Sequence, residues 1–178
     1  MMRQLHDTEP ADSLYPMFIK PETGKFYKND VTLGARADSL YEYLMKQGLQ
    51  LAGLAARDAE VKAHAEMLVG MWGRSVAGIE ANLLKRNSDG LLYVQERYGT
   101  QMRDKMDHLV CFLPGAMALG ARLTGKAAHV DEARELLRTC YEFYSAMPTG
   151  LSPEICKFPD GGKLIADPGA KHSLLRPE

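Results

Sequence analysis

The longest regular pattern in this chain is an amphipathic helical stripe between residues 58 and 85. Its apolar side chains recur every three or four positions, which is the spacing of one face of an α-helix. They are Val61, Ala65, Leu68, Trp72, Val76, Ile79 and Leu83. Because such a stripe must be buried, this helix is expected to pack against a neighbouring helix.

Three further helices follow from shorter stretches with the same periodicity. One covers residues 38–52 and has Asp38 or Ser39 as its predicted N-cap. A second covers residues 114–125, where a proline suits the first turn and a glycine the end. The third covers residues 130–147 and carries acidic residues near its start, where the helix dipole favours anions.

The remaining segments predict loops and short β pieces. Residues 1–30 read as loop with a hairpin around 21–27, and residues 91–98 alternate like a short strand or hairpin. From residue 148 onward the chain is rich in proline and glycine and reads as extended loop. Because strands and helices do not alternate regularly, Rossmann and TIM-barrel folds are disfavoured. The expected fold class is all-α, with paired helices and short β-hairpins in the connections.

Charge and length exclude several classes of protein. A net charge of -1 over 178 residues lacks the basic excess of a nucleic-acid footprint or a polybasic membrane patch. The sequence has no apolar run of the ~18 residues that a membrane-spanning helix needs. The N-terminal residues also lack the apolar core of a signal peptide. The chain alone therefore predicts one soluble domain that binds no nucleic acid, does not insert into a membrane and stays in the cytosol.

The three cysteines do not define a framework by themselves. Cys111, Cys140 and Cys156 are an odd number, and their spacing matches neither a redox motif nor a zinc site. Composition alone favours buried, apolar cysteines.

Five carboxylates are candidates for acid–base chemistry, although each has a simpler explanation. Asp38 could cap a helix, Glu42 lies one turn later on the same face, and Asp107 could be another cap. Glu154 could belong to a plain loop and Glu178 to a solvated chain end. Hydrolysis of a glycosidic bond requires two carboxyl groups that flank it, and a wider separation of the two admits the water used by inverting enzymes.

Four sequence blocks support a catalytic role for these carboxylates. They are TLGARADSLYEYLMKQ from residue 32, KMDHLVCFLPG from 105, TGLSPEI from 149 and HSLLRPE from 172. In this order they resemble the class I α-1,2-mannosidases, which are calcium-dependent glycosidases. The resemblance implies an incomplete (α/α)7 barrel, with residues 1–178 forming part of one catalytic domain that is truncated at both ends.

The resemblance also implies roles for individual residues. Asp38, Glu154 and Glu178 match the family's catalytic carboxylates, with Glu178 in the place of the proposed general base. Other matches line the glycan pocket, where arginines and acids give charge-assisted hydrogen bonds to sugar hydroxyls. They are Arg36, Glu42, Asp107, His108 and Arg176.

One disulfide is implied as well. Cys111 and Cys140 stand in the two sequence contexts where these mannosidases carry a bridge, and Cys156 would then be unpaired.

The sequence departs from the family in several places. It has no counterpart of an acidic residue on an earlier helix, and it lacks the C-terminal threonine that helps to hold Ca²⁺. Because Ca²⁺ prefers six to eight oxygen ligands, the isolated chain is expected to bind it weakly or not at all. Gly48 replaces a tryptophan found in many members, a change expected to weaken that helix by up to ~1 kcal/mol relative to alanine.

Two functions remain open at this point. The first is hydrolysis of terminal α-1,2-linked mannose from oligomannose N-glycans by an inverting, calcium-dependent enzyme of the endoplasmic reticulum or Golgi, with the isolated chain inactive. The second is a non-catalytic, mannosidase-like factor that recognises glycans during glycoprotein quality control and degradation. Oligomannose glycans on glycoproteins are the expected partners in both cases.

Overall fold

The computed structural model describes residues 1–56 and 58–174, and it contains the four predicted helices. They are α2 (Asp38–Ala52), α3 (Ala59–Asn82), α4 (Phe112–Thr124) and α5 (Ala128–Ser145). The side chain of Asp58 caps α3 by accepting from the backbone N–H groups of Glu60 and Val61. Gly125 ends α4 in the left-handed conformation, with a φ of 70°.

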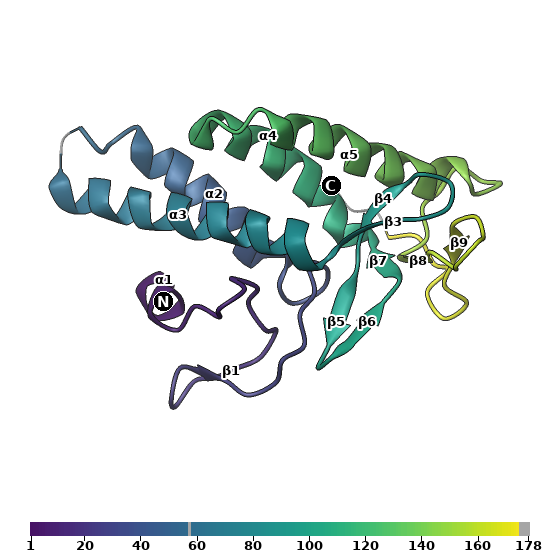
Figure 1. Ribbon diagram of the computed structural model, residues 1–178, viewed down its shortest axis with the longest axis horizontal. Coiled ribbons are helices and arrows are strands. Elements are labelled where there is room, and N and C mark those ends of the chain that lie inside the picture. Colours follow the sequence, from purple (N-terminus) through teal and green to yellow (C-terminus); the bar gives the residue numbers. More distant parts are fainter. Residues whose placement is uncertain (57, 175–178) are drawn as a thin grey trace.

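The helices form two antiparallel pairs that lie side by side (Figure 1). α2 packs along α3, α4 packs along α5, and α4 also contacts both helices of the first pair. Six of the seven residues in the predicted stripe are buried in this arrangement, with Leu68 and Trp72 fully inaccessible to solvent, and Val61 is half-buried. The expectation of paired helices is therefore confirmed.

Two glycines allow the helices to approach closely. A Cβ atom on Gly120 of α4 would lie 2.3 Å from the indole Nε1 of Trp72, and one on Gly48 of α2 would lie 2.8 Å from Cγ2 of Val69. Both distances are shorter than a van der Waals contact. The glycine that was expected only to weaken α2 thus permits its contact with α3.

Replacing Gly120 by alanine is expected to destabilise the chain by about 1–2 kcal/mol. Overpacking against Trp72 costs about 1–3 kcal/mol, and the better helix propensity of alanine returns up to about 1 kcal/mol. Gly73→Ala is the matched control, since nothing lies within 4 Å of a Cβ at that interior position of α3. Urea unfolding should show the control to be as stable as the parent or more so. Equal effects of the two substitutions would contradict the close packing.

The N-terminal segment is more ordered than its composition suggested. It begins with a helix, α1 (Met2–Asp7), which the loop prediction missed, and continues to the predicted hairpin of β1 (Ile19–Lys20) and β2 (Lys25–Phe26). Between them, the segment lies on the helices. The Ser75 hydroxyl donates to the Ser13 carbonyl at 3.0 Å, and the Tyr41 hydroxyl accepts from the Tyr15 N–H at 2.9 Å.

Within the described residues, the strands are short and fall into four small sheets. Besides the β1–β2 hairpin, two are local hairpins, formed by β3 (Leu84–Arg86) with β4 (Leu92–Val94) and by β5 (Glu96–Tyr98) with β6 (Gln101–Arg103). A three-stranded antiparallel sheet joins β7 (Lys105–Asp107), β8 (Ile155–Lys157) and β9 (Ile165–Ala166). The segment after residue 148, predicted as loop, therefore contributes two strands and ties the C-terminal part to the middle of the chain.

A disulfide joins Cys111, in the 3₁₀ helix η1 (His108–Cys111), to Cys140 on α5. Its Cα atoms are 5.9 Å apart, and Cys156 is free and buried. The pairing implied by the family resemblance is confirmed.

Reduction of this bridge is expected to lower the free energy of unfolding by about 3 kcal/mol. The closed loop spans a sequence separation of 29 residues, and the chain-entropy model assigns such a loop about that value. Denaturant unfolding with and without a reductant measures the loss. The Cys111→Ala/Cys140→Ala double variant should show the lower stability and no response to the reductant, so an equal response in both proteins would contradict the assignment.

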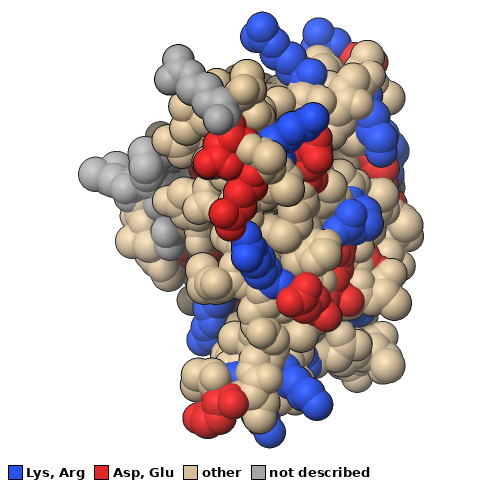
Figure 2. All heavy atoms as spheres, turned by 90° about the vertical axis from the view of Figure 1, so that its left-hand side faces the viewer, with Lys and Arg blue, Asp and Glu red and all other residues tan. Residues whose placement is uncertain are grey.

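Two further observations concern the helices and the surface. Among the described helices, none combines the length and apolar character needed to cross a bilayer. On the face drawn in Figure 2, basic and acidic side chains are interspersed.

Candidate functional site

Backbone contacts bring the four sequence blocks together at one place in the fold. The Ala35 N–H donates to the Asp107 carboxylate at 3.3 Å, which joins the first block to the second. The His108 N–H donates to the Glu154 carbonyl at 2.9 Å, which joins the second to the third. The Glu154 N–H lies 3.0 Å from the His172 carbonyl, at the start of the fourth. Segments as far as 72 residues apart in the chain therefore meet.

Strand register explains the meeting of the second and third blocks. In the β7–β8 ladder Asp107 is opposite Ile155, so His108 follows one strand directly beside Glu154, which precedes the other. The Glu154 side chain is half-buried and that of His108 is buried. The His108 Nε2 lies 2.6 Å from the Tyr144 hydroxyl of α5.

Asp38 is the first residue of α2 and is half-buried. The prediction that Asp38 or Ser39 caps the helix is wrong, because Ala37 occupies the cap position and no side chain makes a capping bond there. The acid is thus free of a capping role.

Glu42 lies one turn after Asp38, and both line a hollow of about 460 Å³ between α2 and α4. Lys46 pairs with Glu42 and lines the same hollow, with Leu109 and Phe112 on the opposite wall. The hollow therefore combines two carboxylates and one ammonium group with an apolar wall. This lining suits a polar ligand that also has an apolar face.

A buried ionic network lies beneath the first block. The Lys105 ammonium is 2.8 Å from Glu96 and 3.1 Å from Asp107, and all three side chains are at most 17% exposed. The Thr32 hydroxyl donates to Glu96 at 2.9 Å and accepts from the Gly34 N–H at 2.8 Å. Burial alone lowers the pKa of Lys105, but the hydrogen bond to Glu96 and the two carboxylate charges outweigh it and raise that pKa.

This network fixes the backbone that leads into Asp38. A Cβ atom on Gly34 would lie only 2.4 Å from Oδ2 of Asp107, so only glycine fits at this position. Arg36 adopts a positive φ of 84°, which costs a non-glycine residue free energy and persists only where its surroundings enforce it. Such enforced backbone is typical of ligand sites.

Other predicted residues lie differently. The exposed Arg36 guanidinium stacks over the Phe18 ring at 5.5 Å instead of entering the network. The Asp107 carboxylate is buried and bound to Lys105 and to a backbone N–H. Arg176 and Glu178 lie outside the described residues, so their assignments stay predictions.

Sequence reasoning missed one group of possible metal ligands. Within residues 1–56 and 58–174, only Glu80, His129 and Glu132 bring three such side chains close enough to share an ion. The i,i+3 spacing of His129 and Glu132 indicates half of this group, but Glu80 is remote in sequence. With one nitrogen and two carboxylates, the group does not fit the all-oxygen cage that Ca²⁺ prefers.

Comparisons with known proteins agree with the sequence blocks. A family model described as glycosyl hydrolase family 47 matches residues 1–178. The endoplasmic reticulum mannosyl-oligosaccharide 1,2-alpha-mannosidase of Rattus norvegicus is 43% identical over 174 residues, covering 94% of this chain and 25% of the rat protein. A mannosyl-oligosaccharide 1,2-alpha-mannosidase of Candida albicans is 36% identical and covers 100% of this chain and 34% of its own length.

The fold is shared with a solved structure. The alpha-1,2-mannosidase from Trichoderma reesei superimposes with a TM-score of 0.76 at 21% identity, over 89% of this chain and 32% of the fungal chain. This chain therefore spans 25% to 34% of the length of the proteins it resembles here.

Proposed function

Because this chain belongs to glycosyl hydrolase family 47, we propose that it forms part of the catalytic domain of an enzyme that hydrolyses terminal α-1,2-linked mannose from oligomannose N-glycans. The observation that carries the proposal is the convergence of the four blocks, which places Asp38, Asp107, His108 and Glu154 on adjoining segments. The chain spans a quarter of the rat relative, so the activity proposed is that of a whole protein.

The proposed chemistry needs an acid that protonates the leaving oxygen and a base that activates water on the opposite face of the sugar. We assign Asp38, Glu154 and Glu178 to this catalytic set, with an inverting outcome. Asp38 suits such a role because its side chain is half-buried, lines a hollow and is not used as a helix cap.

Substrate contacts are proposed for the polar side chains around these acids. Glu42 shares the hollow of Asp38 and can accept hydrogen bonds from sugar hydroxyls. The exposed Arg36 and the C-terminal Arg176 would supply donors. Asp107 and His108 are buried, and their proposed role combines contact with the glycan and support of the surrounding backbone.

The barrel and the compartment are further parts of the proposal. The four helices are assigned as consecutive members of an (α/α)7 barrel, which accounts for the exposed apolar side chains Leu119, Leu137 and Tyr141 on α4 and α5. The disulfide supports a site of action in the secretory pathway, because such bridges persist in oxidising compartments. Calcium dependence rests on the family resemblance alone.

A chimeric enzyme tests the proposal directly. This chain would replace the matching segment of the rat mannosidase, and mannose release from an oligomannose glycan would be measured. Activity is expected, with β-mannose as the first product seen by NMR if the reaction inverts, and with loss of activity after chelation if Ca²⁺ is required. The isolated chain is expected to release no mannose. If the chimera folds and binds the glycan but releases no mannose, the catalytic function would be wrong and glycan recognition would take its place.

A further inference from the structure

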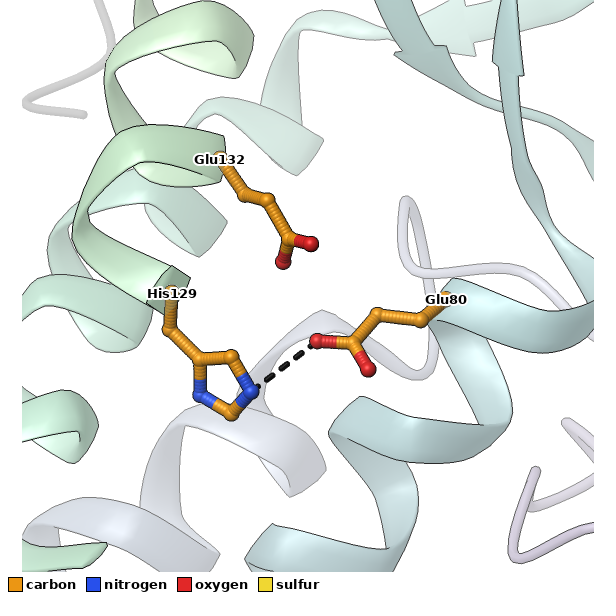
Figure 3. Close-up of side chains that lie close together, drawn as sticks. All are labelled: Glu80, His129 and Glu132. Atoms are coloured by element: carbon orange, nitrogen blue, oxygen red, sulfur yellow. Dashed lines mark ion pairs between the residues drawn. The ribbon is translucent and has the colours of Figure 1, made fainter. Parts of the chain in front are cut away.

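Three ligand-type side chains meet between α3 and α5, away from the four blocks (Figure 3). Glu80 comes from the last turns of α3, and His129 and Glu132 come from the first turns of α5. The His129 Nε2 is 3.0 Å from the Glu80 carboxylate, and one ligand atom from each residue lies within 4.8 Å of the other two. The group is therefore already assembled by the packing of the helices.

The surroundings of the group favour a bound cation. His129 is 4% exposed and points its Nε2 at Glu80, and Oε2 of Glu132 is buried without a hydrogen-bond partner. Two carboxylates thus face each other, and a positive ion between them would relieve their repulsion.

We propose that Glu80, His129 and Glu132 form a Zn²⁺ site that links α3 to α5. Imidazole nitrogen and carboxylate oxygen are ordinary zinc ligands at about 2 Å. Two ligands of a tetrahedral ion at that bond length lie roughly 3.3 Å apart, close to the 3.0 Å between His129 and Glu80. A water molecule would complete the four ligands. Because one donor is nitrogen, Zn²⁺ is favoured over Ca²⁺.

The site is separate from the proposed catalytic region. His129 precedes Tyr144, the partner of the blocks' His108, by 15 residues of α5, which is roughly 22 Å along the helix. Its role is structural: α5 packs mainly on α4, and the metal would join it directly to α3. A ligand that binds only the folded state raises the melting temperature.

Zn²⁺ titration of the purified 178-residue chain, in competition with a chromophoric chelator, tests the site. The parent is expected to bind one Zn²⁺ and to gain melting temperature, while Ca²⁺ gives no such gain. Co²⁺ should give the visible absorption of a nitrogen- and oxygen-coordinated tetrahedral ion. Glu132→Gln should weaken Zn²⁺ binding at least about tenfold, and His129→Gln should weaken it as strongly.

Two comparisons separate this result from misfolding and from surface binding. Without metal, Glu132→Gln should melt at the same temperature as the parent or higher, because it removes the repulsion from Glu80. His6→Gln is the matched control, since His6 also lies beside a carboxylate, 3.3 Å from Asp7, but with no third ligand. It should bind Zn²⁺ like the parent. Equal affinity in the parent and Glu132→Gln would overturn the proposal, as would a loss in His6→Gln alone.

Discussion

Replacing Asp38 by asparagine in the chimeric enzyme is expected to lower kcat for mannose release by about 10²–10⁴-fold, with KM nearly unchanged. The amide has almost the same shape as the carboxylate, so the glycan should still bind in the hollow beside α2. It can neither accept nor deliver the proton that general acid–base catalysis requires, and this loss sets the size of the effect. Steady-state kinetics with an oligomannose glycan measure both constants.

The matched control for this substitution is Asp131→Asn. Asp131 also lies in the first turn of a helix, where it pairs with Arg134 at 2.6 Å, but it is exposed on α5. Both substitutions remove a favourable interaction with a helix dipole, worth about 0.3–1 kcal/mol, and should have similar effects on stability. Only the change at Asp38 should affect turnover. Retained activity in Asp38→Asn would remove Asp38 from the catalytic set.

The helices could be predicted from the sequence because their signals are local. The apolar residues of the 58–85 stripe recur at helical spacing along its whole length, and Gly125 ends α4 where the apolar pattern stops. The strands β7 and β8 could not be predicted in the same way. Each has three residues, too few for a clear alternation, and their pairing joins segments 50 residues apart. Such pairing depends on tertiary packing that no local window contains.

The candidate site was likewise predictable only in part. The blocks around Asp38, Asp107 and Glu154 were found because residue types and order match a family, and the structure then brings these blocks together. The side-chain interactions that hold these blocks in place were not predicted. No role was predicted for Glu96 or for the side chain of Lys105, yet their side chains are only 4% and 17% exposed and pair with each other. The candidate catalytic residues could be identified from the sequence, whereas the ionic network that holds their backbone could not.

Replacing Lys105 by methionine is expected to destabilise the chain by about 3–5 kcal/mol. Lys105 is the cation that separates Glu96 from Asp107, whose side chains are 4% and 10% exposed. Methionine keeps much of the apolar stem but removes the ammonium, so two buried carboxylates lose their counter-ion. Removing one partner of a buried ionic network costs more than the network itself contributes, because desolvated charge is left uncompensated. Urea unfolding of the purified chain measures the change.

A lysine-to-methionine substitution at an exposed ion pair is the control. Lys62→Met removes a lysine that faces Glu66 at 3.8 Å, with both side chains more than 60% exposed, and should change stability by no more than about 0.5 kcal/mol. Adding Glu96→Gln to Lys105→Met should recover part of the loss, since one of the two uncompensated charges disappears. In the chimera, Lys105→Met should also lower activity, because Asp107 then holds Ala35 and the backbone before Asp38 less firmly. If Lys105→Met and Lys62→Met had equal effects, the network would not be what fixes this part of the site.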